Sequence, residues 1–544
     1  MEPVKIGKFT LESLTTGMYS DSRIIYREYI QNSTDAIDAA IKANIITQEE
    51  ARIDIIIDEK KKRISIKDNG IGISYDNVWH TLGDIGNSAK SAEENRGFRG
   101  IGRLGGLSYA NELQFITSVK GQDVRTIYLW DSKKLRELLQ PGKYMDYDLT
   151  KVMNEISCIV KEKEDKDKHY FQVILDGIDE QYAELLNVEN IRDYLSQVAP
   201  VPFDAQRFPY YFDDKEGILA EINRINKPVE EYNIYLNGDP NPIYKPYKTW
   251  FTADRKHKKK DDITGIEFFK SYKDDNELLF WGWYARTNWL GAIIDDNIKG
   301  LRVRKKNILI GDGNTLHSND FYTQERYNSW VVGEVHVYDE SIIPNARRDY
   351  FEKNETYEFF RKRLKQITRE VLSKFPGKYS NARTEKKNLE EAEKVIPEIT
   401  KKLENGLTSE LQREELYEKL DSVKEKIKPN EVNKKYKSST KNTNKKKAID
   451  IDKGDKGELS TSDFIENKKK SVFSKLQNLE NQIIDSDVYR TKDIPSSYPK
   501  CCRKVVSIIF EEIDSTLQES EAENLIENII ERLRVKPKSN KRNG

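Results

Sequence analysis

The stretch EYIQNSTDA, residues 28–36, places Glu28, Asn32 and Asp35 four and then three positions apart. It lies within residues 22–43, where isoleucine and tyrosine recur near helical spacing, so we expect a helix there. The three side chains then fall within an arc of about 60° on one helix face. The amide oxygen of Asn32 suits a hard cation such as Mg²⁺, and the carboxylate of Glu28 can polarise a water molecule. The alternative is the solvated polar face of a surface helix.

A second motif, DNGIGI at residues 68–73, follows a strand-like segment and ends it in a turn. Gly70 and Gly72 allow the backbone to approach a flat ligand closely. Asp68 offers an acceptor to an exocyclic amine such as N6 of adenine, and Ile73 can supply apolar cover. Taken alone, an ordinary D-N-G turn explains the motif equally well.

A third motif, GFRGIGRLGG at residues 97–106, has five glycines in ten positions. Glycine-rich loops that lead into a helix N-terminus present backbone N–H groups to phosphate. The residues expected to make these contacts are Gly100, Ile101, Gly102 and Gly105. The spacing G-x-G-x-x-G is also that of a dinucleotide fingerprint, but no strand directly precedes it and no βαβ unit surrounds it, so we reject a Rossmann fold.

Alternating apolar residues predict short strands around these motifs. The expected strands are residues 51–58, 62–67, 112–119, 124–130 and 170–175. The first two are joined so tightly that they form an antiparallel hairpin. Helices on one face of a mixed or antiparallel sheet predict an α+β architecture that begins with a two-layer α/β sandwich.

The three motifs in this order resemble the GHKL superfamily of ATPases, whose Bergerat fold is shared by DNA gyrase B, heat-shock protein 90, sensor histidine kinases and MutL. The nearest branch is that of the heat-shock-90 (HtpG-like) chaperones. Its helix motif has the same E-x-x-x-N-x-x-D-A form and follows a similar dipeptide, here Tyr19-Ser20. Residues 82–91, LGDIGNSAKS, resemble the start of that family's ATP lid, whereas GFRG at 97–100 resembles MutL.

The resemblance implies a site for ATP and Mg²⁺ built on the helix face. Glu28 would be the general base and Asn32 the Mg²⁺ ligand, with Asp35 beside them. Asp68 would bind adenine directly and through a water molecule near Gly72. The glycine-rich loop would wrap the phosphates.

The resemblance also places residues on the lid and on a late strand. Asn87 or Lys90 would reach phosphate from the lid. The family carries a Gly-Thr pair at the start of the late strand, and its threonine shares the adenine-bound water. Here Tyr170 and Phe171 stand at that position. Either another hydroxyl replaces the threonine or the alignment is shifted.

A second region, residues 297–310 and 331–354, resembles the middle domain of the same chaperones. It carries the loop IPNARRD, in which the family's arginine reaches the γ-phosphate. Matching positions gives Arg348, with Asn345 beside it and Arg347 as the alternative. An arginine suits this role because it is always charged and can bind two phosphate oxygens at once through its guanidinium group. The competing interpretation is a surface loop with a structural ion pair.

The resemblance covers roughly residues 5–375, and composition divides the rest. Trp281, Trp283 and Trp289 are expected in the core of the middle domain. We expect these parts: an ATPase domain (1–200), a middle domain (201–375), a charged coiled-coil-like helical segment (376–428), a disordered Lys/Ser/Asn-rich linker (429–470) and a helical C-terminal interaction domain (471–544).

Charge and cysteine content narrow the class of protein. Lys+Arg and Asp+Glu number 92 each in 544 residues, so a global electrostatic footprint for nucleic acid is absent. Three cysteines without a C-x-x-C spacing and five scattered histidines indicate reduced thiols, a cytoplasmic location and no zinc site. The N-terminus lacks the apolar core of a signal peptide, and no apolar run is long enough to cross a membrane.

The expected activity is hydrolysis of ATP to ADP and phosphate, which drives a conformational clamp. We expect a homodimer that remodels a protein client or partner complex in the manner of a chaperone. The alternative is a DNA-associated clamp ATPase of the MutL or MORC kind, in genome or phage defence, with DNA held by the lysine-rich stretch 434–447. A third interpretation is a nucleotide-binding scaffold that does not hydrolyse.

Overall fold

The chain, in a computed structural model, divides into two compact units. The first comprises residues 1–376 and 446–454, and the second residues 377–445 and 455–544. The structure describes residues 6–15, 17, 21–86, 96, 100–273, 277–405, 407, 410–428, 449–451, 460–486, 494 and 498–535.

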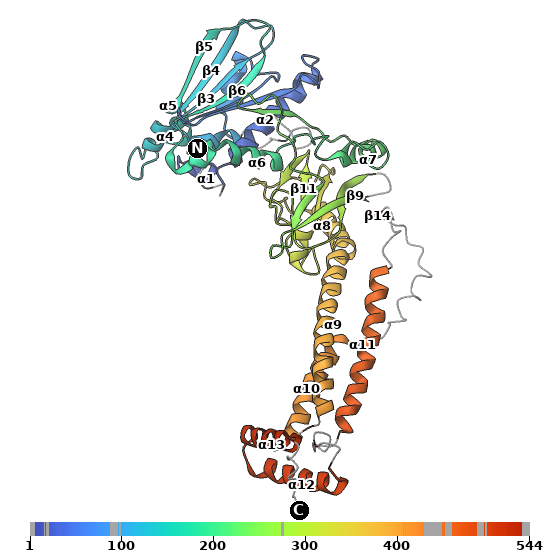
Figure 1. Cartoon of the computed structure of the whole chain (residues 1–544). Coiled ribbons are helices and arrows are strands. Elements are labelled where there is room, and N and C mark those ends of the chain that lie inside the picture. The colour runs from blue at the N-terminus through green and yellow to red at the C-terminus, as the bar shows by residue number, and fades with distance from the viewer. Residues whose placement is uncertain are drawn as a thin grey trace, which may run out of the picture. The chain divides into compact units, whose positions relative to one another are not determined.

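The N-terminal part of the first unit contains a seven-stranded sheet in the order β5-β4-β3-β6-β2-β1-β7 (Figure 1). Its strands are β1 (Arg52–Asp58), β2 (Arg63–Asp68), β3 (Glu112–Ser118), β4 (Val124–Asp131), β5 (Ser157–Lys163), β6 (Tyr170–Asp176) and β7 (Asn233–Leu236). Strand β1 pairs antiparallel with β2, as the tight connection predicts, and parallel with β7. The sheet is therefore mixed.

Helices cover one face of this sheet. In β1 the side chains of Ile53, Ile55 and Ile57 are buried against them, whereas Ile56 on the other face is 47% exposed. This alternation gives the two-layer α/β sandwich that the sequence predicts. The helices are α1 (Thr10–Leu14), α2 (Ile24–Lys42), α3 (Tyr75–Val78), α4 (Ser132–Leu138), α5 (Leu149–Ile156) and α6 (Val188–Val198), with the short turns η1 (Trp79–Gly83), η2 (Gly102–Ser108) and η3 (Glu180–Leu186).

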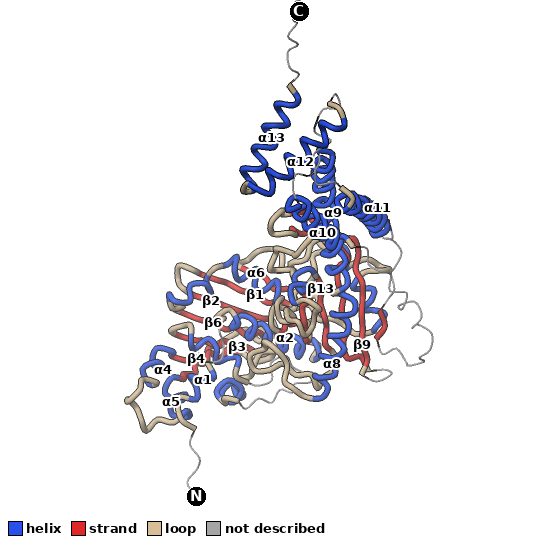
Figure 2. Tube along the Cα trace, turned by 90° about the horizontal axis from the view of Figure 1, so that it is seen from below, coloured by secondary structure: helices blue, strands red, loops and turns tan. Residues whose placement is uncertain are grey.

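A second sheet forms the middle part of the first unit, in the order β12-β11-β13-β10-β9-β14, with β8 paired to β9. Its strands β13 and β9 are labelled in Figure 2. Its strands are β8 (Trp250–Ala253), β9 (Lys259–Tyr272), β10 (Leu278–Thr287), β11 (Gly300–Lys305), β12 (Ile308–Ile310), β13 (Val332–Val337) and β14 (Ile449–Ile451). The accompanying helices are α7 (Ile218–Ile225), α8 (Glu355–Ile367), η4 (Pro209–Tyr211), η5 (Glu325–Trp330) and η6 (Thr368–Leu372). Trp281, Trp283 and Trp289 are buried, so their expected place in the core is confirmed.

A cluster of charged side chains is buried in this middle part around Glu334 of β13. Glu334 lies 2.6 Å from Arg304 Nε and 3.1 Å from Lys245 Nζ, and all three side chains are fully buried. Tyr247 and His336 also bond to this carboxylate, at 2.9 and 3.1 Å. Burial opposes ionisation, but Arg304 and Lys245 hold the pKa of Glu334 well below its ordinary value.

The second unit is helical, as expected for the C-terminal region. It consists of α9 (Lys374–Asn405), α10 (Glu410–Ile427), α11 (Ser460–Ile484), α12 (Lys500–Thr516) and α13 (Glu519–Arg534). Helices α9, α10 and α11 share one apolar core that includes Leu389, Leu420 and Leu476 (Figure 1). The coiled-coil-like pair that the sequence suggests is thus completed by a third helix.

The expected linker, residues 429–470, is partly structured. Helix α11 begins at Ser460, inside that range, and Lys469 on it pairs with Glu385 of α9 at 3.0 Å. Strand β14 pairs antiparallel with β9. The lysine-rich stretch 434–447 lies outside the described residues. Within the described part of the chain, no helix combines the length and apolarity needed to cross a membrane.

Candidate functional site

Helix α2 carries the first motif with its polar residues turned inward. Glu28 and Asp35 are buried, and Asn32 is half-buried. Asp35 Oδ1 accepts a hydrogen bond from the main-chain N–H of Arg96 at 2.9 Å. Because a solvated surface helix would expose both carboxylates, that alternative is wrong.

The second motif packs against the same helix. Asp68 ends β2 with its side chain buried, and its Oδ1 accepts the N–H of Gly70 at 2.9 Å. The N–H of Ile71 donates to the carbonyl of Ala36 on α2 at 3.1 Å. Gly72 has φ +72°, and a Cβ there would overlap the carbonyl of Ser118 on β3. The turn therefore requires glycine at position 72 for both its backbone conformation and its close approach.

The third motif contacts α2 near Glu28. A Cβ on Gly102 would lie 2.5 Å from Glu28 Oε2, so only glycine leaves room for the carboxylate. The N–H of Gly106 donates to the Tyr29 hydroxyl at 3.1 Å. Gly100, Ile101 and Gly105 lie in or directly before the same short helix η2. The structure thus brings the three motifs together around α2.

Arg103 connects η2 to the start of the lid-like segment. Its Nε and Nη2 donate to the carbonyls of Leu82 and Asp84 at 2.9 and 2.5 Å. Burial lowers the pKa of Arg103 to about 10. Asn87 and Lys90, which the resemblance assigns to the phosphates, lie outside the described residues.

The middle part of the unit contributes Arg348 to this cluster. Its Nε lies 3.2 Å from Glu28 Oε1, and its Nη2 donates to the carbonyl of Arg96 at 2.6 Å. The loop that carries it is closed by a bridge between Pro344 and Phe351. Arg348 has φ +56°, a left-handed conformation that costs a non-glycine residue about 1–2 kcal/mol. Such strain persists where surrounding contacts fix the residue, as these do.

The neighbouring Arg347 is placed differently. Its side chain is exposed, and its carbonyl accepts a hydrogen bond from Arg27 Nη2 at 3.1 Å. Arg27 also lies 3.6 Å from Glu28 Oε1, so two guanidinium groups approach one carboxylate oxygen. Within the described residues that oxygen is ion-paired but accepts no hydrogen bond.

The sequence did not point to two residues near Asp68, namely Thr117 and His169. Phe171 lies opposite Asp68 across the β2–β6 pair, and Thr117 lies opposite Phe171 across β3–β6. The Thr117 hydroxyl accepts the N–H of Ile73 at 2.8 Å. His169 Nδ1 lies 3.0 Å from the Gly70 carbonyl. A hydroxyl from the neighbouring strand β3 thus stands beside the turn, and only the strand register could have identified it.

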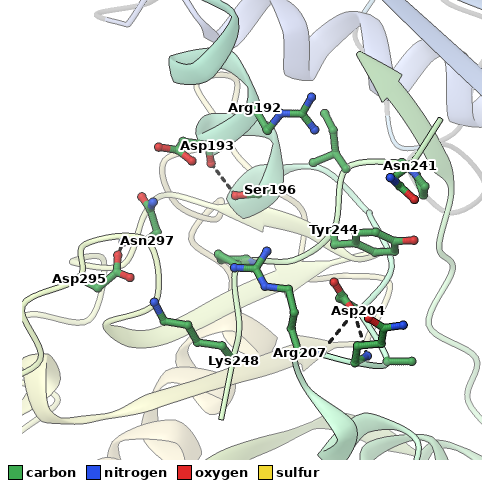
Figure 3. A pocket seen from close by; sticks show the side chains of 15 residues that line it. Arg192, Asp193, Ser196, Asp204, Arg207, Asn241, Tyr244, Lys248, Asp295 and Asn297 are labelled. Carbon is green, nitrogen blue, oxygen red and sulfur yellow. Dashed lines mark hydrogen bonds between the residues drawn. The ribbon is translucent and has the colours of Figure 1, made fainter. Parts of the chain in front are cut away.

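A separate polar cleft of about 630 Å³ lies between α6 and the segments 204–207, 241–248 and 295–297 (Figure 3). Its charged lining consists of Arg192, Arg207, Lys248, Asp193, Asp204 and Asp295. Because basic and acidic side chains are equally represented, the lining does not favour an anionic ligand such as a phosphate.

Comparison with known proteins finds a matching family model and several similar chaperones. Residues 19–157 match the family model described as histidine kinase-, DNA gyrase B-, and HSP90-like ATPase. The chain is 24% identical over 393 residues to the chaperone protein HtpG of Buchnera aphidicola and 23% identical over 398 residues to that of Clostridium acetobutylicum. It is 32% identical over 143 residues to HtpG of Campylobacter jejuni, covering 22% of this chain and 23% of that protein.

The two longer alignments cover 68% of this chain, but only 56% and 57% of the Buchnera and Clostridium chaperones. The chain thus spans little more than half the length of these relatives. The family match falls on the part of the chain that carries the α2 motif, the Asp68 turn and the glycine-rich loop. The part of the chain within residues 19–157 is thus similar to the histidine kinase-, DNA gyrase B-, and HSP90-like ATPases, and 68% of the chain aligns with HtpG chaperones.

Proposed function

We propose that this protein binds ATP with Mg²⁺ and hydrolyses it to ADP and phosphate. The observation that supports this best is the pairing of Arg348 with Glu28, at 3.2 Å. It joins a carboxylate suited to proton transfer, on helix α2, with a cation suited to phosphate, on a loop of the middle part. A scaffold that only binds nucleotide needs neither group.

The residues present fit a magnesium triphosphate. Glu28 Oε1 is buried and ion-paired but accepts no hydrogen bond from the described residues, so it retains the capacity to accept one from a water molecule. Asn32, one turn further along α2, offers a neutral oxygen of the kind that Mg²⁺ accepts. An Mg²⁺ ion held there would supply positive charge that offsets the negative charge developing on the phosphates.

In this proposal Glu28 orients the attacking water and accepts its proton. Arg348 leaves the Glu28 carboxylate and binds the γ-phosphate oxygens instead. The exchange is electrostatically reasonable because a phosphate carries more charge than the carboxylate it replaces. The main-chain N–H groups of η2 and the loop from Gly100 hold the remaining phosphates. Asp68 accepts a hydrogen bond from the exocyclic amine of adenine.

We propose that hydrolysis changes the angle between the N-terminal and middle sheets and so acts on a protein partner. The relatives named as chaperones support a protein client rather than a small-molecule substrate. We place the protein in the cytoplasm as a homodimer, in line with its reduced cysteines and helical C-terminal unit. The DNA-clamp alternative depends on residues 434–447, which the structure does not describe.

Two variants test the site directly. Glu28→Ala should keep ATP binding and abolish hydrolysis, and Asp68→Asn should lose binding. Glu180→Ala is the control, because Glu180 is exposed and pairs with Lys62 at 2.9 Å, away from the motifs. Steady-state phosphate release and calorimetry with a non-hydrolysable ATP analogue give the two readouts. Equal turnover of the wild type and Glu28→Ala would refute the assignment.

The client can be sought with the same variant. Glu28→Ala protein held in ATP should accumulate in the closed state and retain its partner. Proteins captured with ATP but not with ADP, and absent with Asp68→Asn, are the expected clients. Capture that does not depend on the nucleotide would argue against an ATP-driven clamp.

A further inference from the structure

Arg96 connects the site to its surroundings through its main chain. The N–H of Arg96 donates to Asp35 Oδ1 at 2.9 Å, and its carbonyl accepts Arg348 Nη2 at 2.6 Å. One residue thus bonds both to helix α2 and to the arginine that faces Glu28. The orientation of the peptide groups at residue 96 therefore bears on where Arg348 lies.

The side chain of Arg96 is fixed on several sides. Its Nη1 lies 2.6 Å from Asp38 Oδ2, and its Nη2 donates to the Tyr232 hydroxyl at 2.9 Å. The same hydroxyl donates to Asp38 Oδ1, which closes a ring of contacts. The Arg96 side chain is only 2% exposed. Burial opposes its charge, but Tyr232, Asp38 and Glu230 hold the pKa of Arg96 above its ordinary value.

A fourth contact reaches the middle sheet. Arg96 Nε donates to the carbonyl of Lys306 at 3.4 Å, in the turn between β11 and β12. Lys306 and Asn307 have φ +49° and +58°, typical of a tight two-residue hairpin turn. Lys245 Nζ donates to Asn307 Oδ1 at 3.0 Å and belongs to the buried cluster around Glu334. The turn that Arg96 contacts is therefore itself held in place.

We propose that Arg96 is a positioning residue for ATP hydrolysis: its buried side chain anchors residue 96, and the carbonyl of that residue holds Arg348 beside Glu28. This inference rests on the proposed ATPase function. The guanidinium has three directions of hydrogen bonding in one plane, and the three partners lie on α2, on the segment before β7 and on the β11–β12 turn. Only an arginine supplies such a fork.

The test compares Arg96→Met with Arg302→Met in the full-length protein. Arg302 is a burial-matched control: it is 1% exposed and bonds to Gln197 and Asp296, and neither of these partners belongs to the described contacts of Arg348 or Glu28. Arg96→Met should lower kcat by about tenfold with KM for ATP almost unchanged, since a positioning group acts on the transition state rather than on binding. Arg302→Met should lower the melting temperature without that fall in kcat.

A double variant separates positioning from a general loss of stability. If Arg96 acts through Arg348, then Arg96→Met in an Arg348→Ala background should cause no further loss of kcat. If instead the losses of kcat caused by the two substitutions multiply in the double variant, the inference is wrong. Arg96→Lys, which can reach Asp38 but lacks the fork, should give an intermediate kcat. Tyr232→Phe provides a milder change in case Arg96→Met does not fold, and it should lower kcat in the same direction.

Hydrogen exchange gives a readout that does not need hydrolysis. Amides in residues 344–351 should exchange faster in Arg96→Met than in Arg302→Met, both without nucleotide. Unchanged exchange would overturn the positioning role even if the enzyme turns over ATP. Equal turnover of wild type and Glu28→Ala would instead refute the proposed function, so the two failures are distinguishable.

Discussion

Arg348 Nε stands 3.2 Å from Glu28 Oε1, although Glu28 lies on helix α2, Arg348 lies on a loop of the middle part, and the two are more than half the chain apart in sequence. The carboxylate expected to activate water is therefore engaged by the cation expected to bind phosphate. This pair joins the N-terminal and middle parts of the first unit at the site. The first prediction follows from it.

Replacing Arg348 by alanine should lower kcat for ATP by about 100-fold or more, because an arginine that neutralises transferring phosphate contributes about 10³–10⁵ in related reactions. Affinity for an ATP analogue should change little. Arg348→Lys should not restore the rate, because a lysine lacks the bidentate fork. Arg347→Ala, whose side chain is exposed, is the matched control. A large loss in Arg347→Ala with normal turnover in Arg348→Ala would reverse the assignment.

Gly72→Ala should abolish ATP binding, because the added Cβ collides with the Ser118 carbonyl and pushes the Asp68 turn away from α2. The matched control is Gly121→Ala. Gly121 also has positive φ, +92°, but nothing lies within 4 Å of a Cβ there. Both variants should lose about 1 kcal/mol of stability from the left-handed backbone. Calorimetry should show that Gly121→Ala still binds; loss of binding in both would contradict the collision argument.

Thr117→Val should weaken ATP binding by about tenfold, because it removes the acceptor for the Ile73 N–H, and an unsatisfied buried donor costs about 1–3 kcal/mol. Thr117→Ser keeps the hydroxyl and should bind ATP almost normally. Dissociation constants from calorimetry provide the measurement. If both variants bind equally well, the hydroxyl on β3 does not support the turn that carries Asp68.

The stability of the middle sheet should decrease below neutral pH because of His336. Burial lowers the pKa of His336 from its ordinary 6.5. An unfolded chain takes up a proton near that pH, whereas the folded imidazole does so only at lower pH. The unfolded state therefore binds more protons, and the free energy of unfolding falls as the pH drops through about 6.5.

The variant His336→Phe keeps the stacking on Trp281, whose ring centroid lies 4.9 Å away, but has no group to titrate. Thermal unfolding between about pH 7.5 and 5.5 should therefore depend less on pH in this variant. His257→Asn, at an exposed histidine on the same unit, is the control and should retain the wild-type slope. An unchanged slope in His336→Phe would show that other groups cause the loss.

Much of the fold follows from local pattern. The alternation of Ile53, Ile55 and Ile57 identifies β1, and isoleucines and tyrosines at helical spacing identify α2, because burial with a period of 2 or 3.6 residues is visible in the sequence. At most strand ends, the predicted limit differs from the observed one by a single residue. What the pattern misses is a strand such as β14, which has three residues and depends on pairing with β9.

Fewer residues of the candidate site could be predicted from the sequence. The sequence points to Arg348 through its loop, but not to Arg96 or Thr117. Arg96 is buried by Asp38 and Tyr232, partners that are distant in sequence, and nothing in its immediate neighbours distinguishes it from a solvated arginine. Thr117 depends on strand register, which the order β3-β6-β2 determines only once the sheet is formed.

The buried carboxylate of Glu334 also constrains how the middle sheet can assemble. Glu334 lies opposite Arg302 on β11 and opposite Trp283 on β10. A slip of β13 by one residue would turn the carboxylate to the other face, away from Arg304 and Lys245, and a buried charge without its partners costs about 3–5 kcal/mol. Misaligned versions of this β-sheet are thereby penalised during folding, so the charge selects one pairing of strands where a purely apolar interior would tolerate several.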